Sequence, residues 1–446
     1  MNDHKKLTRK TLLILTIALI MTFAGAAYGY QTLRSPAQPT AKSVKIITAT
    51  DLHFLSPQIN DKSEILKNLS ARGDGKVVPY SGEIVEAFMD QVIQAKPDYL
   101  VLTGDLTYNG EETSHEDLVK ILHKVEANNI EVLIIPGNHD ISIPFAYAFK
   151  EGQAWEENSV TYAEFYEMYK DFGPGEALLK DSASASYIKE VSDKLWIAMI
   201  DVNTEKNSNK ISKDTLTWLD SALAEAKAKG AAVISGTHQN ILIHNERFSD
   251  GYLIDNHSDL QKLLESYGVR YNMTGHIHIQ NLALSETGLN ETVTGALAVS
   301  PHNFAQITID PAMNLTYQTE SVNVSAWAKA QNLKDPNLLD FANYSHQYFF
   351  DININRNLAR YIEVPDMTEE KLTTLATYST EINLAYFAGE ATAKIKALES
   401  DPIFLQLKDE PGDNLFRDYI NSFLKQPQIS QNETHFSLLS TAGPAK

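Results

Sequence analysis

Short apolar runs alternate with longer segments whose apolar residues recur every three or four positions between residues 44 and 274. The short runs are rich in β-branched residues and predict strands, and the periodic segments predict amphipathic helices. The predicted strands are residues 44–50, 99–103, 131–135, 195–200, 231–235 and 271–274. The predicted helices are residues 81–96, 114–128, 213–229 and 259–267. Because strands and helices alternate, we expect parallel strand pairing in an α/β fold.

The pattern changes after residue 275. Residues 279–322 predict a β-meander with a turn at Thr287-Gly288, and its clearest strands are expected at 297–299 and 304–309. Amphipathic helices are then predicted at 332–341, 369–380, 385–398 and 415–424. We therefore expect an α/β domain over residues 43–322 and a helical C-terminal domain over residues 323–446.

The first 30 residues are not expected to belong to the fold. Four basic residues precede an uncharged, mostly apolar run over residues 11–27, and Ala24-Gly25-Ala26 matches a signal-peptidase pattern. This organisation predicts an exported protein. Two interpretations stay open: a cleaved signal peptide and secretion, or an uncleaved anchor that associates with the outer side of the cytoplasmic membrane through residues 11–27. Residues 31–42 are expected to form a linker.

Charge and composition limit the possible partners and the atoms that could bind a metal ion. The 446-residue chain has a formal net charge of −19, which disfavours duplex nucleic acid as a partner. A small anionic substrate remains compatible, because bound cations reverse the local field. The chain has no cysteine, which excludes disulfides and thiolate metal sites. Any metal ion must therefore be held by nitrogen and oxygen atoms. The oligomeric state is not indicated.

Five islands rich in Asp, His and Asn lie at or just after the ends of predicted strands. They are Asp51-Leu52-His53, Gly104-Asp105, Gly137-Asn138-His139-Asp140, Gly236-Thr237-His238 and Gly275-His276-Ile277-His278. Each island alone is more often a turn. In an open α/β sheet, however, ligands bind beyond the carboxyl ends of strands, so the fold is expected to gather all five at one edge.

Together the islands offer enough ligands for two metal ions. We expect one ion to be held by Asp51, His53, Asp105 and His278, and the other by Asp105, Asn138, His238 and His276. The Asp105 carboxylate would bridge the two ions. The neutral amide of Asn138 limits the negative charge, so that an anionic substrate is still able to enter. The donor set suits Mn, Fe or Zn, and the sequence does not choose among them.

The order D-x-H, GD, GNHD, GxH and GHxH resembles that of the calcineurin-like metallophosphoesterase superfamily, over about residues 44–310. Residues 104–110 (GDLTYNG) and 323–331 (NVSAWAKAQ) are similar to exported bacterial class III cyclic-nucleotide phosphodiesterase-like proteins. The resemblance implies a four-layer sandwich of two mixed β-sheets flanked by helices, plus an α-helical C-terminal domain. One position departs from the pattern: Gln239 follows His238, where related proteins often have a second histidine that contacts substrate.

The resemblance and the ligand chemistry imply hydrolysis of small phosphodiesters, with 3′,5′-cyclic nucleotides as the leading candidate, through attack of a metal-bridging hydroxide. His139 is the expected catalytic residue, as a group that stabilises the transition state or protonates the leaving oxygen. Asp140 is expected behind the ligands, where it could orient an imidazole. Asn109 and His244 are candidates for substrate contact. His115 and His123 fall on a predicted helix and are expected to be solvated.

Two alternatives stay open. An exported phosphomonoesterase or nucleotidase would use the same scaffold and the same two metal ions. A non-catalytic, envelope-associated binding module would belong to a different class, although such proteins usually lose metal ligands and this chain keeps all seven.

Overall fold

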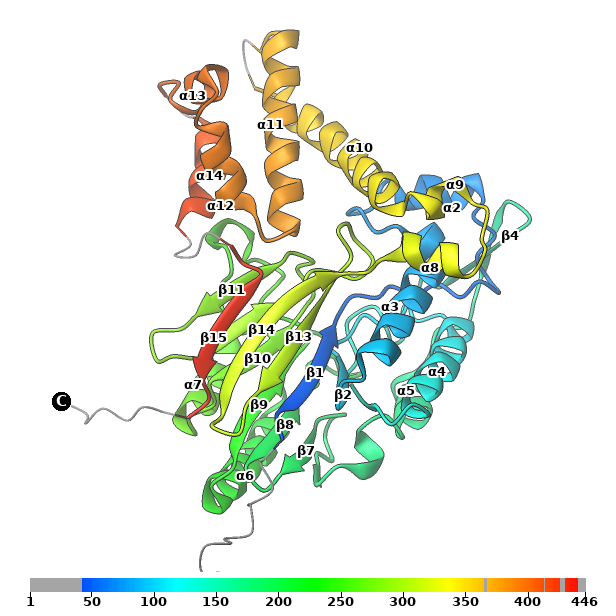
Figure 1. Cartoon of the computed structure of the whole chain (residues 1–446), viewed down its shortest axis with the longest axis vertical. Coiled ribbons are helices and arrows are strands. Elements are labelled where there is room, and N and C mark those ends of the chain that lie inside the picture. Colours follow the sequence, from blue (N-terminus) through cyan, green and yellow to red (C-terminus); the bar gives the residue numbers. More distant parts are fainter. Residues whose placement is uncertain (1–41, 365–366, 413, 426–429, 440–446) are drawn as a thin grey trace, which may run out of the picture. The chain divides into compact units, whose positions relative to one another are not determined.

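Two β-sheets organise the computed structural model, which describes residues 42–364, 367–412, 414–425 and 430–439 (Figure 1). The predicted signal or anchor segment, residues 1–30, lies outside the described residues. Among the helices of the described ranges, none combines the length and hydropathy that a membrane span requires. By their contacts, the described residues from Val44 onward form one unit.

The first sheet has the strand order β15-β14-β13-β1-β2-β3. Strands β1 (Val44–Ala49), β2 (Tyr99–Leu102) and β3 (Glu131–Ile134) pair in parallel, as predicted. Strands β13 (Asn303–Ile309) and β14 (Asn314–Ser321) extend the sheet antiparallel on the other side of β1. The sheet is therefore mixed, and the carboxyl ends of its three parallel strands lie at one edge.

The second sheet has the strand order β11-β12-β10-β9-β8-β7-β6. Its centre is formed by β8 (Leu195–Met199), β9 (Ala232–Gly236) and β10 (Tyr271–Thr274), which again pair in parallel. Strand β12 (Asn290–Val293) is parallel to β10, and β11 (Asn281–Leu284) pairs antiparallel with β12 across the predicted turn at Thr287-Gly288. Strands β7 (Tyr187–Ser192) and β6 (Leu179–Lys180) complete the other edge antiparallel.

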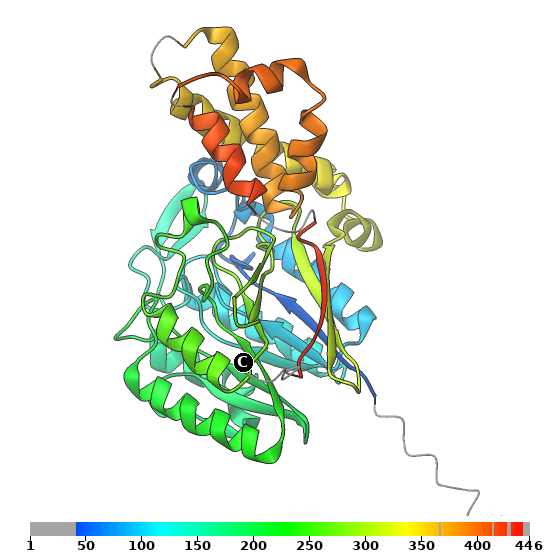
Figure 2. The same cartoon turned by 90° about the vertical axis from the view of Figure 1, so that its left-hand side faces the viewer.

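Burial of apolar side chains stacks the layers in the order helix, sheet, sheet, helix (Figures 1 and 2). Helices α3 (Ser81–Ala95), α4 (Glu112–Glu126) and α5 (Tyr162–Tyr169) cover the first sheet. Helices α6 (Lys213–Lys229) and α7 (His257–Ser266) cover the second. A third cluster, which includes Ile46, Leu133, Ile197 and Met273, fills the space between the sheets. The predicted four-layer α/β arrangement is confirmed.

The C-terminal region is mainly helical, as predicted, but its helices differ in detail. They are α8 (Val324–Ala330), α9 (Pro336–Leu339), α10 (Phe341–Tyr361), α11 (Glu369–Phe387), α12 (Ala391–Leu398), α13 (Pro402–Lys408) and α14 (Leu415–Leu424). The sequence pattern missed most of α10. It also ended α11 early, at residue 380, and joined the last turn of α11 to α12 in one predicted helix over 385–398. Strand β15 (Glu433–Ser437) then pairs with β14, so the chain returns to the first sheet after the helices.

The predicted strand at residues 297–299 is wrong. These apolar residues are buried, but Leu297 and Ala298 form a turn, in which their N–H groups donate to the carbonyls of Thr50 and Asp51 at 3.0 and 3.1 Å, and Val299 makes only an isolated bridge with Lys76. Burial without sheet pairing therefore produced the strand-like pattern. The structure also contains elements that the pattern did not predict, including α2 (Glu64–Ser70) and the hairpin of β4 (Tyr147–Lys150) and β5 (Gln153–Glu156).

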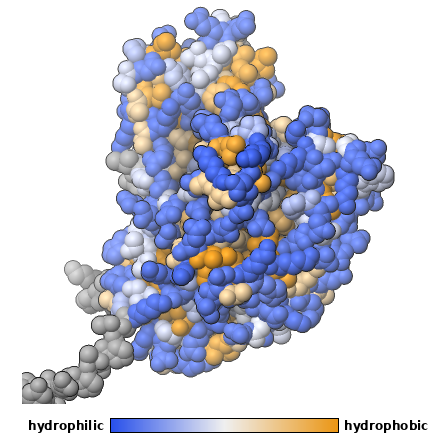
Figure 3. Space-filling view, turned by 45° about the vertical axis from the view of Figure 1, so that its right-hand side comes forward, coloured by the Kyte–Doolittle hydropathy of each residue, from blue (hydrophilic) through white to orange (hydrophobic). Residues whose placement is uncertain are grey.

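The face of the molecule drawn in Figure 3 is mostly hydrophilic, with apolar residues in several separate patches. This agrees with the charged content of 21% and with the burial of the large aliphatic side chains in the interior clusters.

Candidate metal centre

The five islands lie where the central parallel strands of both sheets end. Asp51 and Asp105 follow β1 and β2, and Asn138 follows β3, all in the first sheet. His238 and His276 follow β9 and β10 in the second sheet. The carboxyl ends of parallel strands share an edge, so residues more than 200 positions apart meet in one pocket. The structure brings the seven predicted ligand residues together, and their role as metal ligands stays a prediction.

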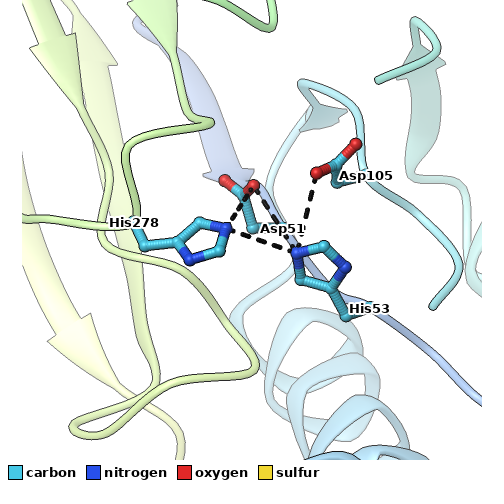
Figure 4. Close-up of side chains that lie close together, drawn as sticks. All are labelled: Asp51, His53, Asp105 and His278. Atoms are coloured by element: carbon cyan, nitrogen blue, oxygen red, sulfur yellow. Dashed lines mark hydrogen bonds and ion pairs between the residues drawn. The ribbon is translucent and has the colours of Figure 1, made fainter. Parts of the chain in front are cut away.

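The first group of donors is Asp51, His53, Asp105 and His278, all buried (Figure 4). His278 Nε2 lies 3.2 Å from Asp51 Oδ1 and 3.3 Å from His53 Nε2. His53 Nε2 lies 3.6 Å from Asp105 Oδ2. Two imidazole nitrogens and two carboxylates thus face one point from three loops.

The second group consists of Asp105, His238 and His276, with Asn138 beside them. His238 Nδ1 donates to the Thr103 carbonyl at 2.8 Å, and its Nε2 faces Asp105 Oδ1 (3.2 Å) and Asn138 Oδ1 (3.1 Å). The His276 ring packs against that of His238 with centroids 5.1 Å apart. Its Nε2 donates to the Gly251 carbonyl at 3.1 Å, so its Nδ1 is the free ring nitrogen.

Asp105 belongs to both groups, because its two oxygens face different ways. Oδ2 faces His53, and Oδ1 faces His238 while it accepts the His139 N–H at 2.8 Å. A β-carbon on Gly137 would lie 2.2 Å from Asp105 Oδ1, so only glycine allows the Asn138 loop to approach this closely. Asp105 is therefore placed where its two oxygens could serve both donor groups.

Five of the seven predicted ligand residues have left-handed backbone conformations. Their φ angles are +52° for Asp51, +41° for His53, +49° for Asp105, +68° for His276 and +64° for His278. Such conformations cost about 1–3 kcal/mol each for residues other than glycine and persist where surrounding structure enforces them. They turn the chain sharply after each strand, so that residues two apart, such as Asp51 and His53, are able to serve one pocket.

The residues present fit a pair of cations. Asp51 Oδ2 accepts hydrogen bonds from Thr50 Oγ1 (2.7 Å) and the His276 N–H (2.9 Å), whereas its buried Oδ1 faces His278 Nε2, at 3.2 Å. Although burial lowers the pKa of both imidazoles, Asp105 raises that of His238 to about 9 and Asp51 with Asp74 raises that of His278 to about 10. These shifts indicate a strongly negative potential, which favours bound cations. The all-nitrogen and oxygen donor set would hold Mn, Fe or Zn.

His139 lies beside the first donor group. Its ring centroid is 4.9 Å from that of His53. Its Nδ1 lies 3.0 Å from both the Tyr108 carbonyl and Asn109 Oδ1, so Nε2 is the ring nitrogen left for a ligand. Asn109, a predicted substrate contact, is thus placed to orient His139, and its contact with substrate stays a prediction.

The Asp140 carboxylate accepts hydrogen bonds from backbone N–H groups of two neighbouring loops. It is fully buried, and it accepts from the Gly137 N–H at 2.7 Å and the Thr107 N–H at 2.9 Å. The expectation that this carboxylate orients an imidazole is therefore replaced by a role in shaping the loop that carries Asn138 and His139. Burial raises the pKa of Asp140 to about 6.

Glu111 supports the Asn109 loop and yields a pH prediction. Its Oε2 accepts the Asn109 N–H at 3.0 Å, and burial raises the pKa of Glu111 to about 8. Between the ordinary pKa and about 8 the folded state binds more protons than the unfolded state, so this group makes stability fall as pH rises. The parent should lose this contribution to its free energy of unfolding between pH 5 and pH 8, whereas Glu111→Gln should not. We therefore expect the stability of the variant minus that of the parent to be about 1–3 kcal/mol larger at pH 8 than at pH 5.

The measurement for Glu111 is urea unfolding at the two pH values, with the exposed Glu116→Gln in α4 as control. If the difference in free energy of unfolding between Glu111→Gln and the parent is the same at pH 5 and pH 8, the pKa of this carboxyl is not raised in the folded protein.

Gln239 occupies the position where related proteins often have a histidine. Its side chain is 1% exposed and forms a reciprocal amide pair with Asn203, with both N···O distances 2.9 Å. Its Nε2 also lies 3.4 Å from Asn138 Oδ1. Gln239 therefore orients the Asn138 amide from behind.

Two other histidines have buried partners. His244 Nε2 lies 3.1 Å from Glu291 Oε1 and its Nδ1 2.9 Å from Asn281 Oδ1, so these contacts fix the loop that follows His238; a substrate contact by His244 stays a prediction. The expectation that His115 is solvated is wrong. It is fully buried and contacts Tyr169 Oη and the Asp140 carbonyl, because α4 turns this polar residue toward the motif loops. His123 is half-exposed, as expected.

Sequence reasoning missed Asp74 and Lys76. Asp74 Oδ2 lies 3.0 Å from His278 Nδ1, and Lys76 Nζ lies 3.4 Å from His53 Nε2. Both belong to the loop after α2, which follows no predicted strand and carries no motif. The only signal in the sequence is a pair of opposite charges two positions apart in a glycine-rich stretch, which is common on protein surfaces.

Comparisons with known proteins agree with this geometry. The family model "Calcineurin-like phosphoesterase" matches residues 44–280, and "C-terminal domain of cyclic nucleotide phosphodiesterase" matches residues 323–428. A curated relative from Ruthia magnifica subsp. Calyptogena magnifica, named "Probable cyclic nucleotide phosphodiesterase", is 24% identical over 241 residues, which cover 51% of this chain and 86% of that protein.

Two solved phosphatase structures are similar at low sequence identity. A dimetal phosphatase from Danio rerio is 14% identical, with a TM-score of 0.46 over 62% of this chain and 96% of that one. The purple acid phosphatase PPD1 from yellow lupin (Lupinus luteus) is 14% identical, with a TM-score of 0.44 over 65% of this chain and 53% of that one.

The family match covers more than half of the chain and includes all five islands. The matched region holds buried Asp and His donors in two adjoining groups. This chain belongs to the calcineurin-like phosphoesterase family of metal-dependent phosphoesterases.

Proposed function

We propose that this protein is a dinuclear-metal phosphodiesterase that hydrolyses small phosphodiesters, with 3′,5′-cyclic nucleotides as the leading substrates. The observation that carries the two-metal chemistry is the position of Asp105, whose oxygens lie 3.6 Å from His53 Nε2 and 3.2 Å from His238 Nε2 in the two donor groups. The cyclic-nucleotide class is supported by the match of residues 323–428 and by the names of the curated relatives.

A pair of bound divalent or trivalent ions would supply Lewis acidity, a water of lowered pKa and neutralisation of the phosphate charge. The protein's own residues would do the rest. Asp105 and the flanking donors would hold the ions on which the phosphate would dock, and such positioning is what phosphoryl transfer mainly requires. His139 is held through Nδ1 by the Tyr108 carbonyl and Asn109, so its Nε2 would be available to deliver a proton to the departing oxygen.

The test is a hydrolysis panel with the Mn-loaded protein. It compares 3′,5′-cyclic mononucleotides, linear dinucleotides, a lipid-like diester, bis(p-nitrophenyl) phosphate and p-nitrophenyl phosphate. We expect kcat/KM for the diesters to exceed that for the monoester by at least about tenfold, which corresponds to about 1.4 kcal/mol of transition-state binding. A monoester preference would replace this proposal with a phosphomonoesterase or nucleotidase. Full metal occupancy without turnover of any ester would support a binding module.

We also propose that the protein acts outside the cytoplasm. The basic residues before the apolar run at 11–27 support export, either as a secreted protein or anchored on the outer side of the cytoplasmic membrane. Fractionation of cells with detection at the C-terminus distinguishes these outcomes: a shortened soluble product indicates cleavage, a full-length membrane-bound one indicates an anchor, and a cytoplasmic product contradicts export.

A further inference from the structure

The loop between α2 and the short 3-10 helix at Val78–Tyr80 brings a lysine to the metal centre. Lys76 Nζ lies 3.4 Å from His53 Nε2 and 3.5 Å from Asp74 Oδ2, and the lysine side chain is only 12% exposed. A buried cation beside a candidate cation site is costly unless anions balance it. Asp74 balances only part of the Lys76 charge, because the same carboxylate oxygen also lies 3.0 Å from His278 Nδ1.

The donors of Lys76 have few partners in the protein. The ammonium group carries three N–H donors. Its hydrogen-bond contact here is His53 Nε2, and its contact with Asp74 at 3.5 Å is an ion pair rather than a short hydrogen bond. When His53 Nε2 binds a metal ion, the lone pair of this nitrogen is no longer available to Lys76. The ammonium group then needs another acceptor in the same pocket.

A phosphate oxygen is the acceptor that the site would offer. A hydrolysed phosphodiester gains negative charge on its non-bridging oxygens as the nucleophile attacks, and a preorganised cation stabilises that charge. Lysine is a common phosphate-binding residue, because it acts as a compact point charge. Lys76 Nζ and the His139 ring both lie beside the His53 ring, so the two groups flank the same candidate ligand.

Helix α10 of the C-terminal region holds this loop in place. Gly75 has φ +103°, and a β-carbon there would lie 2.3 Å from the Phe349 ring of α10. Arg356, two turns further along α10, donates through Nη2 to the Gly73 carbonyl. On the other side, the Val77 N–H donates to the Ala298 carbonyl at 2.8 Å, and the Ala298 N–H donates to the Asp51 carbonyl at 3.1 Å. The loop is thus fixed between α10 and the backbone of a predicted metal ligand.

We propose that Lys76 binds a non-bridging oxygen of the substrate phosphate and that α10 positions it for this contact. The inference rests on the proposed phosphoesterase function and assigns the C-terminal region a role in substrate binding. It adds a positive group to the pocket that is not one of the predicted metal ligands.

The experiment measures inorganic phosphate binding to the Mn-loaded full chain by calorimetry, with metal content and melting temperature determined on the same samples. In Lys76→Met we expect the Kd for phosphate and the KM for bis(p-nitrophenyl) phosphate to rise by about 10- to 100-fold, the effect of losing one charge-assisted hydrogen bond. Metal content should equal that of the parent. Lys76→Arg should recover part of the affinity. Lys67→Met, an exposed lysine on α2, is the matched control.

The outcomes separate the two proposals. The inference would be overturned if Lys76→Met kept full metal content and bound phosphate as tightly as the parent. It would also be overturned if the variant lost metal but bound phosphate normally after metal was added back, because Lys76 would then have a purely structural role. If Lys76→Met does not fold, Lys76→Gln keeps a polar side chain of similar length and is judged by the same criteria. A parent protein that binds phosphate but hydrolyses no ester would refute the proposed function while leaving Lys76 testable by Kd.

The role of α10 is tested with Arg356→Gln. We expect phosphate affinity to fall by about 3- to 10-fold with metal content unchanged, because the loop loses one anchor. Arg360→Gln, one turn further along the same helix and in contact with Asn357 of that helix, is the control. Equal affinities in the two variants would show that α10 does not position Lys76.

Discussion

Asp105→Asn is expected to reduce kcat by at least about 10³-fold, roughly 4 kcal/mol in activation free energy, and to lower the bound metal to one ion or less per chain. The substitution preserves shape but removes the charge of the one carboxylate whose oxygens face both donor groups, at 3.6 Å from His53 and 3.2 Å from His238. Metal analysis after loading and diester hydrolysis under saturating Mn check the two parts of this result.

The control for Asp105 is Asp310→Asn, the same chemical change in the turn between β13 and β14, where the carboxylate accepts the Asn314 N–H at 2.9 Å. That variant should keep full metal content and activity. An Asp105→Asn protein that holds two ions and retains more than about one tenth of the parent rate would contradict the bridging role of this carboxylate.

His139→Gln is expected to lower kcat for alkyl phosphodiesters by about 10²–10⁴-fold while both metal ions remain bound. The reason is geometric: the His139 ring is held by the Tyr108 carbonyl and Asn109 and is not a member of either donor group. If this residue protonates the leaving oxygen, the loss should be much smaller for bis(p-nitrophenyl) phosphate, whose leaving group needs no proton. The ratio of the two losses is the measurement.

His123→Gln, at the half-exposed histidine of α4, is the control for His139 and should leave both rates unchanged. An equal loss for good and poor leaving groups would assign His139 to charge stabilisation instead of proton transfer. A fall in metal content would make it a ligand, contrary to its position in the structure.

The sheets were predictable because short β-branched runs leave a clear periodic signal. The strands β1, β2, β3, β8, β9 and β10 appear where expected, and the ends of five of them carry the motif residues. The prediction of strands failed where apolar residues are buried without belonging to a strand. Leu297 and Ala298 are buried by a turn against the end of β1, which a sequence pattern does not distinguish from a strand. Helix α10 contains many polar residues along its length, so its apolar face was too sparse to recognise.

In the candidate site, the sequence indicated which residues come together but not how their side chains are oriented. The residues predicted as ligands could be recognised because their types and order carry the chemistry, and the strand ends bring them together. The orientation of each side chain depended on contacts that have no sequence signal: His238 is fixed by the Thr103 carbonyl, Asn138 by Gln239, and the Asn138 loop by Asp140. The burial of His115 against the Asp140 carbonyl likewise depends on how α4 packs.

By itself, the sequence determined the α/β class, the family and the set of Asp, Asn and His residues that meet at the strand ends, because local periodicity and motif order are properties of the chain. Only the tertiary structure decided that Asp74 and Lys76 reach this centre and that Phe349 and Arg356 of a distant helix hold their loop. Such contacts join segments nearly 300 positions apart through packing and single hydrogen bonds, and nothing in the local pattern of either segment encodes its partner.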